Sequence, residues 1–289
     1  MIEKYGETNL WLTIGALVFY AHATSVCVSI RYGFLADAFG RKNVPGKVFG
    51  LVGTSMAAGY VIMFVTQLTE KMMRKWNSKT IMASNLLGYA IVAFITGFSY
   101  SIPNTTVVIA ISFVMRIIQG LLAYTSTLVP VDFINAHFPE KFDMVNGLLN
   151  MGFFSGHGMA EVLGSIIYDH LGYAAAYAFS AVVALTAGVA VCCFIPKSRT
   201  YLSSQTDQSH DNLMSENIIE SENTKLSKFL ILPMVATMLI NANYGVLQVS
   251  NLFNCNPINF SMTLVVLSFV LQSVPHCMKH NHMCRDHVK

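Results

Sequence analysis

The sequence predicts an all-α, polytopic membrane protein, and both its composition and the length of its apolar runs support this fold class. Of the 289 residues, 54% are hydrophobic and only 11% are charged, against about a quarter charged in an ordinary soluble domain. The apolar residues form runs of about 20, the length that crosses a bilayer as a helix. They lack the alternation of outer-membrane strands. A chain with so little charge cannot cover a soluble surface, which argues against a soluble enzyme.

Six predicted membrane spans fill the first two-thirds of the chain, with turn-forming residues between them. The spans cover residues 9–31, 46–68, 80–102, 105–130, 145–168 and 173–195. Pro, Asn and Gly mark the breaks, as at Pro103-Asn104 and at Gly172. Glycine also recurs inside the spans, which suits the close packing of helices in lipid.

A polar stretch after the sixth span divides the chain into two helical parts. Residues 196–228 are rich in Ser, Asn, Asp and Glu, a composition that cannot bury enough apolar surface to fold alone. Two further apolar runs follow, at 229–250 and, more weakly, at 258–275. The expected organisation is a cytoplasmic tail over 1–8, a six-helix bundle over 9–195, a cytoplasmic linker over 196–228, one or two helices of an incomplete second bundle over 229–275, and a tail over 276–289.

The distribution of Lys and Arg predicts a cytoplasmic N-terminus, because basic residues are enriched on the cytoplasmic side of membrane proteins. In that orientation ten Lys and Arg fall in inside segments and four fall in outside loops. The four outside residues are Arg31, Arg41, Lys42 and Lys47. The net charge of +3 is small and no basic stripe is present, so we expect the lipid bilayer and no nucleic acid as a partner.

Two motifs inside the spans resemble those of the major facilitator superfamily. The fourth span carries RIIQG at 116–120, which is similar to the arginine-bearing motif of that family's fourth helix. The fifth span is similar to the glycine-rich fifth-helix motif of the proton antiporters, although Glu161 stands in place of the usual proline. The residues that carry the two matches are Arg116, Gln119 and Gly120 in the fourth span and Gly156 and Gly164 in the fifth.

A third signature of this family is a loop motif of the form GxLxDRxGRR between helices two and three, and the chain has two candidates for it. Residues 33–42, GFLADAFGRK, match the pattern closely but lie between the first two spans, outside the membrane in the predicted topology. Residues 66–75 lie in the correct loop but lose both glycines. We give more weight to the position of a motif between the spans than to its match with the family pattern. We therefore expect Glu70, Arg74 and Lys75 to form the motif loop.

Within the superfamily, residues 10–195 resemble the vesicular amine and polyamine transporters. The matching stretches are GKVFG at 46–50, FPEK at 138–141, NGLL at 146–149 and GY at 172–173. The resemblance implies a secondary active transporter for proton-coupled exchange of a small organic cation, in an intracellular vesicle or the plasma membrane. The incomplete second half leaves one alternative. A truncated isoform or fragment would not transport, and would act as a membrane bundle or as the partner of a full-length copy that supplies the missing half.

Four ionisable residues fall deep inside the predicted spans, where charge is costly and by default marks a pathway. They are His22, Arg116, His157 and Glu161. At 1.5 Å of rise per residue, they lie about 10–16 Å from the outer ends of their spans. We expect one midplane layer in which Glu161 exchanges protons beside Arg116 and the histidines line the path. Packing within a satisfied polar network is the alternative role for each residue.

No metal site, cofactor or enzymatic activity is expected. No nucleophile–base pair or metal-binding triad occurs at helical spacing inside the spans. The histidines and cysteines of residues 276–289 do not match the spacing of a standard zinc site. The six cysteines lie mostly in apolar runs and are interpreted as small core residues.

Overall fold

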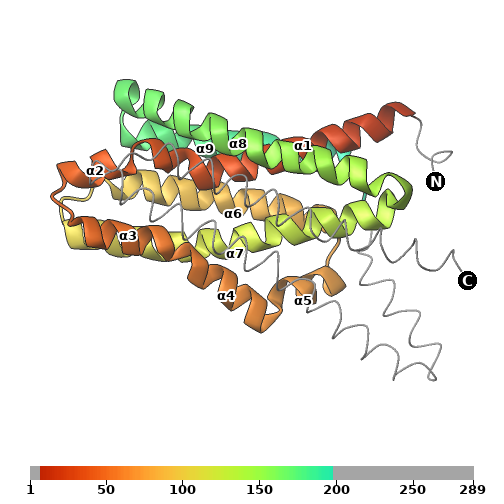
Figure 1. Cartoon of the computed structure of the whole chain (residues 1–289), viewed down its shortest axis with the longest axis horizontal. Helices are drawn as coiled ribbons and strands as arrows, with labels where there is room; N and C mark the ends of the chain where they lie inside the picture. Colours follow the sequence, from red (N-terminus) through yellow and green to blue (C-terminus); the bar gives the residue numbers. More distant parts are fainter. Residues whose placement is uncertain (1–6, 198–289) are drawn as a thin grey trace, which may run out of the picture. The chain divides into compact units, whose positions relative to one another are not determined.

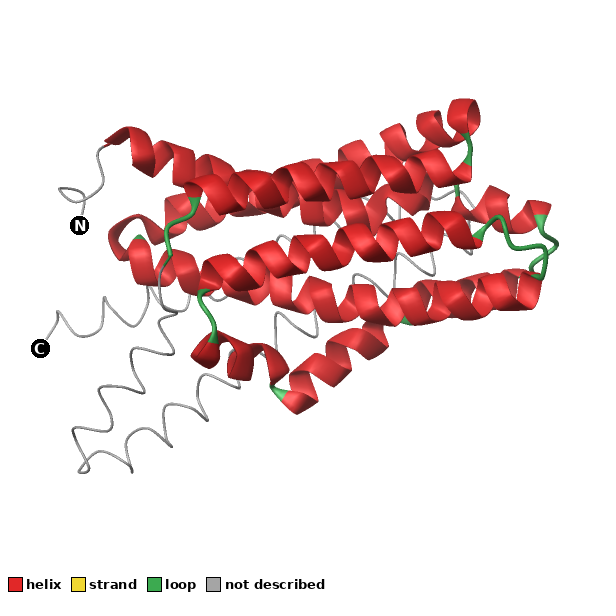
Figure 2. Cartoon of the chain, turned by 180° about the vertical axis from the view of Figure 1, so that it is seen from behind, coloured by secondary structure: helices red, strands yellow, loops and turns green. Residues whose placement is uncertain are grey.

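The computed structural model describes residues 7–197, and this part of the chain is helical without any strand, as Figure 2 shows. Its elements are α1 (Glu7–Ser29), η2 (Ile30–Gly33), α2 (Leu35–Arg41), α3 (Gly46–Thr54), α4 (Met56–Thr66), α5 (Leu68–Lys75), α6 (Ser78–Ser99), α7 (Thr105–His137), η3 (Pro139–Lys141), α8 (Phe142–Leu171) and α9 (Tyr173–Phe194). The predicted all-α class is confirmed. Most of the predicted linker, the helices at 229–275 and the tail lie outside the described residues.

Five helical stretches of the described part are long and apolar enough to cross a membrane. They are Leu10–Gly33, Gly46–Thr66, Ser78–Ser99, Thr105–His137 and Tyr173–Phe194. These stretches correspond to the first four and the sixth predicted spans. The helix α8 covers the fifth predicted span with 30 residues, more than a bilayer requires. It is not among the five because Gly, Ser, His and Glu161 interrupt its apolar residues.

The second and fourth predicted spans differ from the helices that form. The second is divided at Ser55 into α3 and α4, and a left-handed residue, Gln67 (φ +51°), separates α4 from the short α5. The helix α7 is longer than predicted, since it continues through Pro130 to His137. It begins where the Asn104 side chain accepts a hydrogen bond from the backbone N–H of Thr106, at 3.0 Å, which satisfies one of its free amides.

The helix α1 is the centre of the bundle. It is the most buried of the five apolar stretches and contacts α6, α7, α8 and α9, and Figure 1 shows it running beside α8. One close approach is to α8, where a Cβ atom on Gly152 would lie 2.6 Å from the carbonyl oxygen of Val18. Without side chains at such positions the two backbones touch, which is how helices associate in lipid.

Candidate functional site

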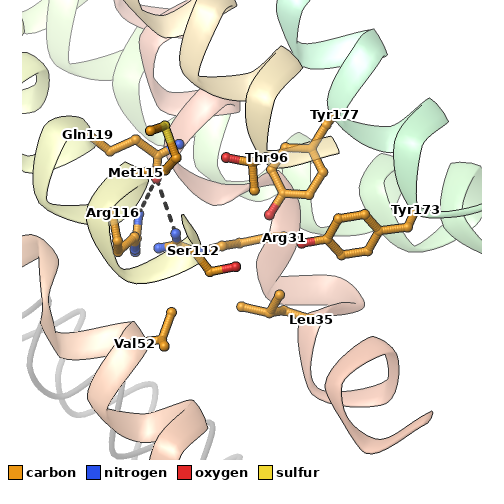
Figure 3. A pocket seen from close by; sticks show the side chains of 10 residues that line it. All are labelled: Arg31, Leu35, Val52, Thr96, Ser112, Met115, Arg116, Gln119, Tyr173 and Tyr177. Carbon is orange, nitrogen blue, oxygen red and sulfur yellow. Dashed lines mark hydrogen bonds between the residues drawn. The ribbon is translucent and has the colours of Figure 1, made fainter. Parts of the chain in front are cut away.

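Two buried arginines meet at the centre of the described bundle. Arg31 lies in the 3-10 turn η2, directly after α1, and is 5% exposed. Arg116 lies in the first half of α7 and is 2% exposed. Figure 3 shows both side chains entering one region between the helices. The tight turn of η2 brings Arg31 back into the bundle.

Neutral acceptors hold both guanidinium groups. The Oε1 atom of Gln119 accepts a hydrogen bond from Nη1 of Arg116 at 2.8 Å and from Nη1 of Arg31 at 3.2 Å. The hydroxyl oxygen of Tyr32 accepts from their Nη2 atoms, at 2.9 Å and 3.3 Å respectively. Both guanidinium carbons also lie over the Tyr32 ring, 5.8 Å from its centre for Arg116 and 4.9 Å for Arg31. These contacts fasten η2 to α7.

No carboxylate forms an ion pair with either arginine among the described residues, where Asp37 pairs with Arg41 instead. A guanidinium group does not lose its proton in a protein, so the cluster has two permanent positive charges. Burying such charges without a counter-ion is strongly unfavourable. A small cavity adjoins the cluster, and its lining residues are Arg31, Leu35, Val52, Thr96, Ser112, Met115, Arg116, Gln119, Tyr173 and Tyr177. The cluster is therefore a polar site with an unbalanced positive charge.

Glu161 lies near this cluster but does not pair with Arg116 as the sequence predicted. Its backbone carbonyl packs against Gly33, and its half-buried carboxylate acts electrostatically on the neighbouring Tyr32. Arg116 reaches Gln119 one turn along its own helix and Tyr32 instead. Similar depth in the bundle does not bring the two side chains together, because the rotation of α8 about its axis decides the contact.

The two predicted histidines form reciprocal contacts across the interface of α1 and α8. Nδ1 of His22 on α1 lies 3.1 Å from Oγ of Ser155 on α8. In the other direction, Nδ1 of His157 on α8 hydrogen-bonds with Oγ of Ser29 on α1. Both rings are half-buried. The histidines therefore bind the helix pair together through serine hydroxyls.

The glycines of the two motifs are points of backbone contact. Gly156 packs against the carbonyl of His22, and Gly164 packs against the carbonyl of Ile30. Gly120 packs against the carbonyl of Met56 across the α4–α7 interface. A side chain at any of these positions would collide with backbone. The fifth-helix motif thus joins α8 to α1 and η2, and the fourth-helix motif joins α7 to α4.

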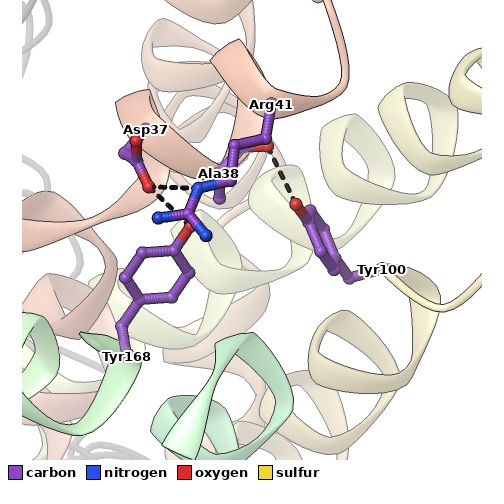
Figure 4. Close-up of polar contacts among 5 residues, drawn as sticks. All are labelled: Asp37, Ala38, Arg41, Tyr100 and Tyr168. Atoms are coloured by element: carbon purple, nitrogen blue, oxygen red, sulfur yellow. Dashed lines mark hydrogen bonds and ion pairs between the residues drawn. The ribbon is translucent and has the colours of Figure 1, made fainter. Parts of the chain in front are cut away.

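The upstream copy of the loop motif forms a network at the end of the bundle (Figure 4). The Oδ2 atom of Asp37 accepts from Nε of Arg41 at 2.8 Å and from the hydroxyl of Tyr168 at 2.7 Å. Lys42 donates to the carbonyl of Ile102 at 2.8 Å. These contacts connect α2 with the end of α8 and with the α6–α7 loop.

The second copy of the loop motif forms α5 and makes fewer contacts. Arg74 and Lys75 are exposed, and Glu70 is half-buried. The helix is attached to α7 through Thr69, whose hydroxyl lies 3.2 Å from that of Thr125. Because Thr125 is in the second half of α7 whereas Ile102 precedes its start, the two copies lie toward opposite ends of that helix.

Arg31 is the candidate site residue that the sequence analysis missed. The sequence assigns it to an outside loop, whereas the structure places it inside the apolar stretch Leu10–Gly33. The outside loop after the first span therefore keeps three basic residues, Arg41, Lys42 and Lys47. The predicted excess of Lys and Arg on the cytoplasmic side over the outside becomes larger. Phe34 and Leu35 continue the apolar character of the span past Arg31, and this feature of the sequence could have placed Arg31 inside the span.

Comparison with known proteins agrees with this architecture. A family model described as Major Facilitator Superfamily matches residues 12–274, far more than half of the chain. No curated protein gives a significant match. The matched region includes nearly all of every membrane-length helix in the described part. The protein is accordingly an integral membrane protein that belongs to the major facilitator superfamily, a family of membrane transporters.

Proposed function

We propose that the protein is a secondary active transporter that exchanges a small organic cation, such as an amine or polyamine, for protons. The proposed location is an intracellular vesicle or the plasma membrane. The placement of Glu161 is the observation on which the proposal depends. It is an acidic group in the second half of α8. This helix lies within the part of the chain that resembles the vesicular amine transporters. An ionisable residue inside a predicted span by default belongs to a pathway.

The surroundings of Glu161 suit a group that changes its ligand. Among the described residues its carboxylate has no hydrogen bond and no ion pair, and it is neither fully buried nor fully exposed. A single carboxylate of this kind binds a proton or an organic cation but not both. Occupation by one ligand then excludes the other, and this competition gives exchange when the two conformations differ in their access to solvent.

The two arginines would restrict where a cation binds. Both guanidinium groups are held by Gln119 and Tyr32, and neither contacts the Glu161 carboxylate. A cationic substrate would be repelled from the arginine cluster, so its binding is confined to the α8 side. His22 and His157 would then line one side of the substrate path, at the edge of the closely packed α1–α8 interface.

The proposed site requires a second set of helices. Transporter sites of this type lie near the midplane at the interface of two repeats, and the described bundle is one such unit. We propose that another copy of the chain supplies the second set. Reconstitution of two differently tagged copies, followed by purification through one tag, tests whether copies of the chain associate.

Uptake by reconstituted vesicles tests the role of Glu161. Full-length protein in liposomes is given a radiolabelled polyamine or monoamine, with and without an imposed pH gradient. We expect Glu161→Gln to reduce gradient-driven uptake by at least about tenfold, a conservative figure for the loss of a proton-transfer group. Exchange of unlabelled for labelled substrate should be weakened but not lost. The control is Glu140→Gln, which neutralises an exposed carboxylate in η3. Normal uptake with a normal pH dependence in Glu161→Gln would rule out this mechanism.

A further inference from the structure

The cavity beside the arginine cluster is surrounded by hydrogen-bond donors. Nε of Arg116 and the hydroxyl of Ser112 are buried, and neither has a hydrogen-bond partner among the described residues. Both residues line the cavity together with Arg31, Tyr173 and Tyr177. Figure 3 shows the hydroxyl ends of the two tyrosines directed toward Arg31. Unsatisfied buried donors are rare in native proteins, and each calls for a physical explanation.

The charged side chains that line the cavity are both positive. Arg31 and Arg116 contribute two fixed cations, and Gln119 and Tyr32, which hold them, are neutral. We propose that this cavity is a binding site for a small anion, a halide ion or a carboxylate group.

The dimensions of the cavity select among anions. It has room for about one water molecule. Chloride, a single atom slightly larger than water, is closest to that size, formate with three heavy atoms is larger, and gluconate is far too large. The Nε–H of Arg116, the hydroxyl of Ser112 and the guanidinium of Arg31 supply donors from α7 and η2. Charge-assisted hydrogen bonds of this type are about twice as strong as neutral ones.

The anion site has the opposite charge preference from the proposed cation site. Glu161 does not line the cavity, and the anion contacts α7 and η2 rather than α8. An anion at this position offsets one of the two positive charges of the cluster and stabilises the contact between η2 and α7. Binding is measured without any transport assay, so failure of the anion site and failure of the cation mechanism are distinguishable.

Thermal unfolding of the full chain in lipid nanodiscs tests the proposal. Sodium chloride or sodium formate is titrated against sodium gluconate at constant ionic strength. We expect Tm to rise and saturate with each small anion, because a ligand that binds only the folded state stabilises it. Arg31→Gln and Ser112→Ala should each weaken the apparent affinity, Arg31→Gln by at least about tenfold. The control Arg41→Gln removes an exposed guanidinium, 66% accessible, and should leave the response intact.

One substitution supplies the negative charge from a side chain of the cluster itself. Gln119→Glu preserves the size of the shared acceptor and adds a negative charge between the arginines, while it removes the hydrogen bond that the amide nitrogen donates to the carbonyl of Cys27. We expect it to raise Tm in gluconate and to abolish the response to chloride and formate. A response to chloride alone identifies a halide site, and a response to formate alone identifies a carboxylate site. The proposal is overturned if neither anion gives saturable stabilisation, or if Gln119→Glu responds as the unchanged protein does.

Discussion

Arg31 and Arg116 donate hydrogen bonds to the same two atoms, Oε1 of Gln119 and the hydroxyl oxygen of Tyr32. One arginine follows the first membrane helix and the other lies within α7, so the shared acceptors connect distant parts of the sequence. The amide nitrogen of Gln119 extends the link by donating to the carbonyl of Cys27 at 3.3 Å. Gln119 therefore joins α7 to α1 and to η2 at once.

Removal of the shared acceptor should destabilise the bundle. Gln119→Leu keeps a similar side-chain volume but leaves one buried hydrogen-bond position of each arginine unpaired. We expect a loss of about 1–3 kcal/mol in the free energy of unfolding, the usual penalty for an unsatisfied buried group. Denaturant or thermal unfolding in detergent measures it. Gln119→Glu at the same position should shift stability in the opposite direction. Equal stability of Gln119→Leu and the unchanged protein would show that other groups hold the arginines.

The membrane class and most spans could be predicted from the sequence because these depend on local composition. Runs of about 20 apolar residues identify helices in lipid whatever their partners. The position of Arg31 could not be predicted in the same way. A charged residue at the end of an apolar run can face solvent or turn inward. Here the inward position depends on an acceptor that a distant helix contributes, the Oε1 atom of Gln119 on α7.

The packing of α8 against α1 should depend on glycine at one position and not at its neighbour. A Cβ atom on Gly156 would meet the carbonyl of His22 and lie 2.7 Å from Cβ of Ser25, whereas Gly158 has nothing within 4 Å. We expect Gly156→Ala to cost about 1–3 kcal/mol, the range for overpacking a well-packed contact. Gly158→Ala should be neutral or slightly stabilising, because alanine favours a helix. Unfolding of the two variants side by side gives the comparison, and equal effects would contradict the contact.

The predicted orientation can be read from two loop positions. Asn43 is exposed in the predicted outer loop before α3, and Asn77 precedes α6 in a predicted inside loop. In a cysteine-free background, Asn43→Cys should react with a membrane-impermeant maleimide in intact cells that carry the protein at the surface. Asn77→Cys should react only after permeabilisation. The reverse pattern would place the N-terminus outside.

The candidate site was only partly predictable, since depth along a helix follows from counting residues but rotation about its axis does not. The sequence predicts that Arg116 and Glu161 meet because their depths differ by about 6 Å at 1.5 Å per residue. The glycines that bring α8 against α1 also fix its rotation, and they place the backbone of Glu161 beside Gly33. The partners of Arg116 consequently come from α7 and η2.

The two copies of the loop motif should respond differently to charge reversal, because orientation depends on basic residues on the cytoplasmic side. Reversal of Arg74 and Lys75 removes two of the inside charges and should lower the fraction of molecules in the predicted orientation. The same reversal at Arg41 and Lys42 removes positive charge from the outside and should leave orientation unchanged or improve it.

The outer pair should instead affect local structure. Arg41 pairs with Asp37 and Lys42 binds the carbonyl of Ile102, but exposed ion pairs contribute little to stability, so most molecules should still fold. The reactivity of Asn43→Cys in intact cells measures orientation for both double variants, and transport in vesicles measures function. We expect the larger loss in both assays for Arg74 and Lys75. A larger loss for Arg41 and Lys42 would instead assign the functional loop motif to residues 33–42, because the close match to the pattern would then outweigh position in the chain.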